Sequence, residues 1–468
     1  MLASVFRNPS WVASWYIVAF ILFIVGLSGV TKVATARRGN LLAAVGVVIA
    51  FLVTLGIPGV NNYGWIVLGL AAGTAVGVPA ARWVRMTQMP QMVALFNGVG
   101  GGAVALISWV EFRKAGGALP IQVEVFSVFA AIIGSISFWG SNIAFAKLQE
   151  LLPGRPIKLP HQALANIGAL GAAVGLAAVL LAGSTSQVVF VFMLVAAAVA
   201  GNLAVLPIGG ADMPVVIAGL NAFTGLSAAG TGIALGNTAL IVAGTLVGAS
   251  GSILTNLMAK AMNRSIPAIA AGGFGGGVAI QAAGGEQRPV HRTDAQDAAL
   301  QLSQARKVKV VPGYGLAVAQ AQRAVADLAA TLEAQGVEVT YAIHPVAGRM
   351  PGHMNVLLAE VDVDYEKLQE MEVANPDFED TDVALVIGAN DVTNPAARNQ
   401  EDSPIYGMPI LDVDHARRVI VIKRSLSPGF AGIDNDLFYN EATQMLFGDA
   451  KQSVMEIQQE LQAELQEA

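Results

Sequence analysis

The chain contains no cysteine, which excludes a disulfide, a thiolate metal site and a cysteine nucleophile. Charged residues are also scarce, at 13% of 468 residues against about 25% in soluble domains. Because 54% of the residues are hydrophobic, much of the chain is expected to face lipid rather than water. The formal net charge of −6 argues against a nucleic-acid partner, and we predict no metal site.

The apolar residues fall into long runs in the first half of the chain. Each run has about 18–24 residues, enough to cross roughly 30 Å of hydrocarbon as a helix. The first run is too long for a secretory signal, and no A-x-A cleavage site follows it. We therefore predict nine membrane spans, at 11–30, 40–57, 62–81, 89–110, 125–146, 162–182, 187–207, 213–236 and 238–258.

Lysine and arginine lie mostly in the loops on one side of these spans. That side holds Lys32, Arg37, Arg38, Arg82, Arg85, Lys147, Arg155, Lys158, Lys260 and Arg264. The other side holds Arg7, Arg113 and Lys114. Because cytoplasmic loops are enriched in these residues, we predict an N-terminus outside and a cytoplasmic C-terminal part.

No predicted span contains an ionisable side chain between its end residues, so the polar atoms at depth are amides and hydroxyls. Asn97 lies eight residues beyond Met89, and Asn221 lies nine beyond Asp212. Helical rise places both amides roughly 12–14 Å deep. The sequence leaves two interpretations of these amides: an ordinary interhelical hydrogen bond, or a role in transport.

Two carboxylates mark the ends of spans. Asp212 precedes a span with Pro214 in its first turn, so a helix N-cap is the plain interpretation. Glu124 opens the fifth span on the outer side, where we expect an interfacial carboxylate to be structural.

The second half of the chain follows a different pattern. Residues 260–294 contain many glycines followed by prolines, which predicts a flexible linker rather than a tenth span. Beyond it, apolar runs alternate with helical stretches, which predicts a Rossmann-like α/β domain with a parallel sheet. The predicted strands are Val308–Val311, Val337–Ile343, Val383–Ile387, Ile410–Val413 and Val419–Ile422. The predicted domains are thus a transmembrane bundle at 1–259 and a cytoplasmic domain at 295–468.

Residues after the first, second and last strands have the chemistry of a dinucleotide site. The turn at Gly313 reads G-x-G-x-x-V, whose small residues let the backbone approach a pyrophosphate. The second strand ends in Ile343-His344-Pro345, with no acid for the ribose 2′-hydroxyl of NAD. The last strand ends in Lys423-Arg424-Ser425, which suits a 2′-phosphate and favours NADP, with a solvated basic end as the alternative.

Two further segments, HPVAGRMPGHMN and VIGANDVTNPAARN, also follow strands and are rich in Gly, Pro and Asn. Ligands of an open parallel sheet bind at that edge. We expect Arg349 to contact the pyrophosphate and Asp391 to hydrogen-bond near the ribose or nicotinamide.

Several stretches together resemble the β subunit of proton-translocating NAD(P) transhydrogenase. They are PGYGLAVAQAQ, IHPVAGRMPGHMNVLLAE, LVIGANDVTNPAA, KRS…PGFAGIDNDLF, MLFGDAK, IGGADMP and AMNRS. The resemblance covers nearly the whole chain and implies Re/Si-specific hydride transfer between NADH and NADP+, coupled to proton translocation. It implies that this chain binds NADP(H), while an α subunit binds NAD(H) and adds membrane helices. A dimer of αβ units in the lipid of a bacterial inner membrane is also implied.

The resemblance carries a set of site residues. The implied cofactor-binding residues are Gly313, Tyr314, Gly315, Ala317, Val318, His344, Pro345, Val346, Ala347, Gly348, Arg349, Met350, Pro351, Gly388, Ala389, Asn390, Asp391, Val392, Thr393, Lys423, Arg424, Ser425, Gly429, Phe430, Ala431 and Gly432. Those implied for catalysis and the proton path are Asp391, Asn221, Asp212 and Asn97. Some family members have a histidine where this chain has Asn97, so the titrating group is predicted to lie on the partner subunit.

Two other functions fit part of the pattern. A nucleotide-regulated ion transporter or channel would bind nucleotide without turnover and would need a filter motif, which the sequence does not show. A membrane-anchored NADP dehydrogenase would not need nine spans and would require a substrate domain. Because the chain has neither a second dinucleotide fingerprint nor a covalent redox centre, the hydride is expected to come from a partner's nicotinamide.

Overall fold

A computed structural model describes most of the chain. The described residues are 9–30, 33–57, 60–116, 119–154, 156–210, 212–262, 265–267, 269, 288–349, 352–403, 405–429 and 431–467. The chain divides into two compact units, Met1–Pro207 with Val216–Leu254 and Ile208–Val215 with Thr255–Ala468. Of the loop lysines and arginines that predict the orientation in the membrane, Arg7, Lys32, Arg155 and Arg264 lie outside the described residues.

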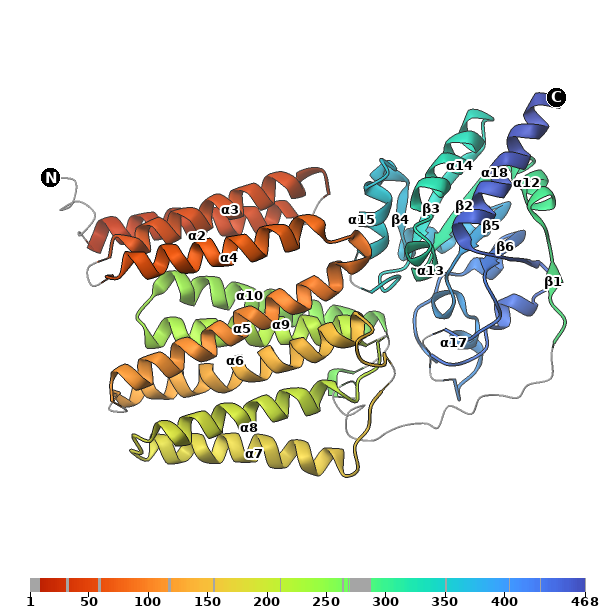
Figure 1. Cartoon of the computed structure of the whole chain (residues 1–468). Coiled ribbons are helices and arrows are strands. Elements are labelled where there is room, and N and C mark those ends of the chain that lie inside the picture. Colours follow the sequence, from red (N-terminus) through yellow and green to blue (C-terminus); the bar gives the residue numbers. More distant parts are fainter. Residues whose placement is uncertain are drawn as a thin grey trace. The chain divides into compact units, whose positions relative to one another are not determined.

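The first unit consists of long apolar helices (Figure 1). They are α2 (Pro9–Val30), α3 (Val33–Leu55), α4 (Tyr63–Trp83), α5 (Met89–Lys114), α6 (Ile121–Leu148), α7 (Gln162–Leu181), α8 (Gln187–Val205), α9 (Met213–Ala234) and α10 (Thr238–Ala261). Within the described residues, nine helices are long and apolar enough to cross a membrane, which confirms the nine predicted spans.

Several helices extend beyond the apolar run that predicted them. Helix α6 begins at Ile121 and ends at Leu148, so Glu124 and Lys147 both lie inside it. Both are buried, with 6% and 2% of their surface exposed. The helical hydrogen bonds continue past the apolar core of the span, which hydropathy alone does not reveal. The span ends therefore carry buried ionisable groups that the predicted bounds left out.

Close packing of α5 against α6 depends on glycine. A Cβ on Gly101 would lie 2.9 Å from the carbonyl oxygen of Gly134, and one on Gly134 would lie 2.6 Å from that of Gly101. Small residues let two membrane helices approach to backbone contact. The van der Waals packing gained in this way holds the helices together, since lipid tails leave no hydrophobic driving force between them. Helix α6 also packs on α8, and α8 packs on α7.

The second unit contains a parallel sheet of seven strands, which confirms the predicted α/β class (Figure 1). The strands are β1 (His291–Arg292), β2 (Lys307–Pro312), β3 (Glu338–Ile343), β4 (Leu368–Glu370), β5 (Val383–Ile387), β6 (Arg418–Lys423) and β7 (Thr443–Phe447). Their order is β1-β7-β6-β5-β2-β3-β4. Chain order reverses between β2 and β5, and ligands of doubly wound sheets bind at such a switch point.

Four of the five predicted strands are confirmed, but Ile410–Val413 is not a strand. Its backbone instead bonds to a 3₁₀ helix, with the Leu411 N–H donating to the Val392 oxygen at 2.9 Å. The 3₁₀ helix η5 (Val413–His415) follows it. A short buried apolar run looks the same in a loop as in a strand. The three strands that the sequence analysis missed are two or three residues long (β1, β4) or begin with polar residues (β7).

Helices connect the strands of the sheet. They are α12 (Ala295–Ser303), α13 (Tyr314–Val318), α14 (Gln322–Ala334), α15 (His353–Ala359), α16 (Met371–Ala374), α17 (Ala396–Asn399) and α18 (Ala450–Glu467). All five residues of β5 are buried, as expected for a central parallel strand covered on both faces. Strand β1 lies within the predicted linker, of which 263–264, 268 and 270–287 are outside the described residues, and the domain boundaries stay a prediction.

Candidate dinucleotide-binding site

A cleft opens where β2, β5 and β6 end. Its cavity is about 360 Å³ and is lined by Gly313, Tyr314, Gly315, Val346, Ala347, Gly348, Gly388, Ala389, Asn390, Asp391, Val392, Lys423, Pro428 and Gly429. A second cavity of about 230 Å³ shares Gly315, Gly388, Lys423 and Pro428 with the first. The second cavity also reaches Arg424 and Ser425. The segments predicted from four separate parts of the sequence therefore meet at one edge of the sheet.

Two glycine turns cross at the floor of the cleft. The Gly315 N–H donates to the Gly388 oxygen at 2.9 Å. A Cβ on Gly313 would lie 2.3 Å from the Ala389 Cα, and one on Gly315 would lie 2.7 Å from the Gly388 Cα. Gly388 has φ +65°, which an L side chain rarely adopts. The predicted G-x-G spacing thus makes room for a second turn as well as for a ligand.

The residues after this turn lie differently from the prediction. Ala317 is fully buried, and Val318 is 47% exposed on the surface. Neither lines the cleft. They belong to the short helix α13, which ends before the longer helix α14 begins.

The loop after β3 is anchored by His344, whose ring is buried. Its Nδ1 accepts a hydrogen bond from the Val346 N–H at 3.2 Å, so its Nε2–H donates to the Pro409 oxygen at 2.8 Å. Burial lowers the pKa of His344 to about 4, which keeps the ring neutral near pH 7. His344 therefore fixes the base of the loop, while Val346, Ala347 and Gly348 line the cleft.

The far side of this loop is held by His353, which the sequence analysis did not single out. Its Nδ1 accepts from the Arg349 N–H at 3.0 Å, and the Arg349 guanidinium lies 4.5 Å above the Tyr314 ring. Burial, with the positive charge of Arg349, lowers the pKa of His353 to about 4. Gly348, at φ +107°, leaves the space that His353 needs, since a Cβ there would lie 2.6 Å away. Met350 and Pro351 lie outside the described residues.

Asp391 also lines the first cavity, from the 3₁₀ helix η4 (Asp391–Thr393). Its Oδ2 accepts a hydrogen bond from the Ala431 N–H at 3.0 Å. A Cβ on Gly429 would lie 2.5 Å from its Oδ1, so a side chain there would displace the Asp391 carboxylate. Gly429 and Ala431, both implied as cofactor-binding residues, therefore lie against Asp391, while Phe430 lies outside the described residues.

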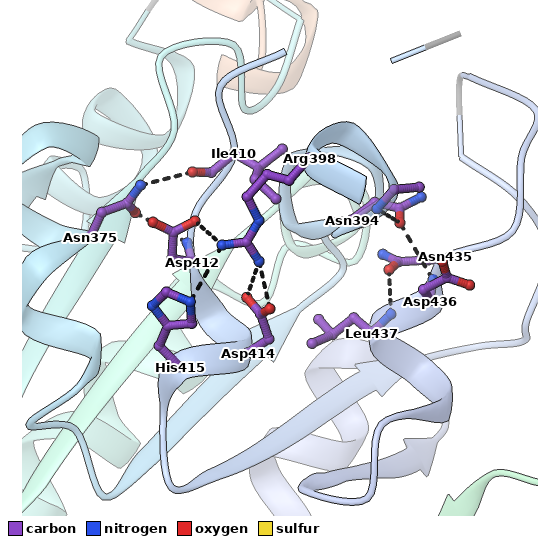
Figure 2. A network of polar contacts seen from close by, with 11 residues as sticks. Asn375, Asn394, Arg398, Ile410, Asp412, Asp414, His415, Asn435, Asp436 and Leu437 are labelled. Carbon is purple, nitrogen blue, oxygen red and sulfur yellow. Dashed lines mark hydrogen bonds and ion pairs between the residues drawn. The ribbon is translucent and has the colours of Figure 1, made fainter. Parts of the chain in front are cut away.

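A network of amides and carboxylates holds the segment that follows Asp391 (Figure 2). The Asn394 side chain donates to the Asp434 oxygen at 2.9 Å and accepts from the Ala396 N–H at 3.1 Å. The Asn435 side chain donates to the Asn390 oxygen at 2.9 Å.

The outer part of this network is ionic (Figure 2). Arg398 pairs with Asp412 at 2.8 Å and with Asp414, while Asn375 donates to the Ile410 oxygen at 2.9 Å. These hydrogen bonds and ion pairs together restrain the segment that follows Asp391.

Cations gather at the end of β6. Lys423 is half-buried, its Nζ donates to the Ser427 oxygen, and burial lowers its pKa while Asp391 opposes that shift. Arg424 is exposed and forms no ion pair with any described residue. The hydroxyl oxygens of Ser425 and Ser427 lie 2.8 Å apart beside it. Charge-assisted bonds from such a group suit a phosphate.

The remaining predicted site residues, Asn97, Asn221 and Asp212, lie in the apolar helices or directly before one. The Asn97 amide donates to Ser141 Oγ at 2.9 Å, and the Ser137 and Thr224 hydroxyls lie 2.6 Å apart. In the described part of the chain, Asn97 and Asn221 are not bonded to each other, and Asn221 is half-buried. Asp212 is buried directly before α9, and its role as a helix cap stays a prediction.

Comparison with known proteins decides the family. Residues 12–460 match the family model described as NAD(P) transhydrogenase beta subunit. The chain belongs to the NAD(P) transhydrogenase beta-subunit family. The protein named NAD(P) transhydrogenase subunit beta of Rhodospirillum rubrum is 48% identical over 453 residues, covering 95% of this chain and 97% of that protein. The protein of that name from a strain of the same species matches equally well.

The transhydrogenase family assignment confirms the resemblance seen in the sequence. Of the residues lining the two cavities, the sequence analysis missed Ala319, Ile422, Ser427, Pro428, Gly448, Asp449 and Ala450. Gly448, Asp449 and Ala450 directly follow β7, and Ser427 and Pro428 lie in the segment that follows β6. Position at the carboxyl end of a strand was the feature that could have found them.

Proposed function

We propose that this transhydrogenase beta subunit binds NADP(H) in the cleft at the switch point and exchanges hydride with NAD(H) on a partner subunit. The observation that carries the proposal is the pair of cavities that share Gly315, Gly388 and Lys423. Of the two cavities, only the first is lined by Asp391, and only the second is lined by Arg424 and Ser425. An elongated dinucleotide with a phosphate at one end matches this distribution of groups.

The residues present fit NADP better than NAD. Lys423, Arg424 and Ser425 would hold the 2′-phosphate, and no carboxylate ends β3 to bind a free 2′-hydroxyl. The crossing of the Gly315 and Gly388 turns would hold the pyrophosphate, where no side chain blocks the backbone. Asp391 would then lie toward the ribose or nicotinamide. When bound, NADP(H) supplies the hydride chemistry, while this chain binds and orients it.

A partner must supply the second nicotinamide. This partner is an α subunit that binds NAD(H) and contributes membrane helices. The two subunits assemble as a dimer of αβ units. Hydride transfer is Re/Si-specific, as in the family that the sequence resembles. Hydride then passes from NADH to NADP+, giving NAD+ and NADPH.

Proton translocation is proposed to pass through the membrane helices. The loop distribution of Lys and Arg favours an N-terminus outside a bacterial inner membrane and a cytoplasmic nucleotide domain. Asn97, Asn221 and Asp212 are proposed as polar groups of the path, with the titrating residue on the partner. Coupling is then reciprocal: if a proton gradient changes NADP(H) affinity, NADP(H) occupancy changes proton affinity.

Purification of the chain with its co-expressed α subunit, followed by reconstitution into vesicles, tests this function. Hydride transfer from NADH to NADP+ that moves protons across the vesicle membrane is expected. Nucleotide binding without hydride transfer would instead favour the alternative, a nucleotide-regulated ion transporter or channel.

A further inference from the structure

Four buried polar side chains lie on helices α5, α6 and α9 toward the end where α5 finishes and α6 begins. Ser108, Glu124, Ser127 and Thr231 are 2%, 6%, 1% and 1% exposed. Each has a side-chain oxygen with no hydrogen-bond partner among the described residues. More than 90% of buried polar groups are bonded in folded proteins, so four such atoms at one place need a physical reason.

On α6 these residues continue a stripe of small and hydroxyl side chains. Glu124, Ser127, Ser137 and Ser141 lie at helical spacing on one face, and we call this set the α6 polar column. Gly134, on the same face, lies in close backbone contact with Gly101 of α5. From first to last it spans roughly 25 Å at about 1.5 Å per residue, most of the hydrocarbon thickness.

Helices α5 and α9 both face this column. On α9, the Thr224 hydroxyl lies 2.6 Å from the Ser137 hydroxyl, and Thr231 lies about two turns further toward the end where α6 begins. On α5, Asn97 donates to Ser141, and Ser108 lies three helical turns beyond it on the same face. The column therefore runs from Glu124 to the Asn97 amide between three packed helices.

A structural role does not account for Glu124. The α6 N-cap residue is Pro120, and no side chain caps the helix. Glu124 forms no ion pair with a described residue, and Lys114, at the neighbouring end of α5, pairs with Glu111 at 3.3 Å. The only other charge at that end of α5 is Arg113, and α7, α8, α9 and α10 bring no charged side chain to this end. A carboxylate buried without a cation is costly in a membrane and usually marks an ion or proton pathway.

We propose that the α6 polar column is the outer part of a hydrated proton path and that Glu124 is the carboxylate that exchanges protons with the outer aqueous phase. This inference rests on the proposed proton translocation and adds a route to it. Glu124 accepts a proton from water at the outer face and passes it to water held by Ser127 and Thr231. The carboxylate is thereby restored, only O–H bonds form and break, and no electron moves.

The first test measures whether water reaches the column, and it does not depend on enzyme activity. Since the chain has no cysteine, a single introduced thiol is its only reactive thiol. The αβ complex carrying Ser127→Cys is treated with Ag+ from the outer side of vesicles, and unprotected thiol is then alkylated and counted by mass spectrometry of this chain. The matched control is Ser135→Cys, because Ser135 is also buried on α6 but donates to the Leu194 oxygen at 2.9 Å, away from the column.

Ser127→Cys is expected to react with Ag+ on the order of tenfold faster than Ser135→Cys, since a dry packed thiol reacts only when the helices open. Equal, slow reaction at both positions would show that the helix interface is dry and would overturn the path. This outcome leaves the proposed transhydrogenase function standing, because hydride transfer is measured separately.

The second test asks whether Glu124 carries protons. Reconstituted αβ vesicles with Glu124→Gln are expected to build a pH gradient at least roughly tenfold more slowly, because an amide does not titrate. The affinity of the complex for NADPH should be unchanged. Glu124→Asp should recover part of the rate. Glu111→Gln, which alters a half-buried, ion-paired carboxylate at the same end, should behave as wild type. A wild-type gradient in Glu124→Gln vesicles would remove Glu124 from the path.

Discussion

The Gly315 N–H and the Gly388 carbonyl oxygen share a hydrogen bond of 2.9 Å, which joins the turn after β2 to the turn after β5. These two strands are neighbours in the sheet, but their turns are more than seventy residues apart in the sequence. The contact brings the backbone amides of both turns to the floor of one cleft. A single pair of glycines thus links the fold of the domain to the shape of its ligand site.

Gly315→Ala is expected to weaken NADPH binding. Its Cβ would lie 2.7 Å from the Gly388 Cα, so the two turns must separate, at a cost of about 1–3 kcal/mol. Calorimetric titration of the purified complex with NADPH measures this loss. Val318→Ala is the control, because Val318 is exposed on the same short helix and should bind as wild type. Unchanged binding by Gly315→Ala would mean that the turns tolerate separation.

Replacing Lys423 and Arg424 together by Ala should weaken NADP(H) far more than any residual NAD(H) binding. Each cation contributes about 1.5–3 kcal/mol when it bonds to a phosphate. Titration with both nucleotides measures the difference in affinity. Arg418→Ala, at the opposite end of β6, is the control and should not change it. Equal loss for NADP(H) and NAD(H) would exclude a 2′-phosphate site at this strand end.

Acidification should destabilise the nucleotide domain through its two buried histidines. Their pKa falls from the usual 6.5 to about 4 on folding, so the unfolded chain binds protons first. The stability they contribute is complete above about pH 6.5 and is lost as the pH falls toward 4. The loss is about 2 kcal/mol per histidine between about pH 7.5 and about pH 5.

Thermal unfolding of the purified complex across this pH range, followed by a probe in the nucleotide domain, tests the effect. His353→Asn keeps an acceptor for the Arg349 N–H but cannot titrate, so it should flatten the pH dependence. His291→Asn changes an exposed histidine and should leave the dependence as it is. If the pH dependence of the unfolding temperature is unchanged in His353→Asn, groups other than His353 cause it.

Asn221→Leu should leave NADP(H) binding largely intact while abolishing proton pumping in reconstituted vesicles. The substitution removes a half-buried amide from α9 without touching the nucleotide domain. Phe223→Leu, at a 42% exposed position on the same helix, should pump normally. Asn97→His would place an imidazole beside Ser141 and is expected to add a second protonation site. If Asn221→Leu vesicles still form a normal gradient, Asn221 is a packing residue.

The order of the membrane helices follows from the sequence alone. A bilayer leaves a crossing chain no water for its backbone, so a run of about 20 apolar residues must form a helix. The same holds for the buried strand Val383–Ile387, whose unbroken apolar run needs cover on both faces. Local composition suffices in these cases because the solvent around the segment dictates its structure.

Only the tertiary structure decided which residues meet. Ile410–Val413 has the composition of a strand, but the hydrogen bonds of Asn375 and Val392 hold it as a loop. His353 anchors the loop over the cleft through a bond to Arg349 that no sequence pattern announces. Glu124 looked like an interfacial residue, but α6 begins earlier than its apolar run and packing buries the carboxylate. The physical reason is common to all of them: burial and hydrogen-bond partners come from segments distant in the chain, and composition records only what is near.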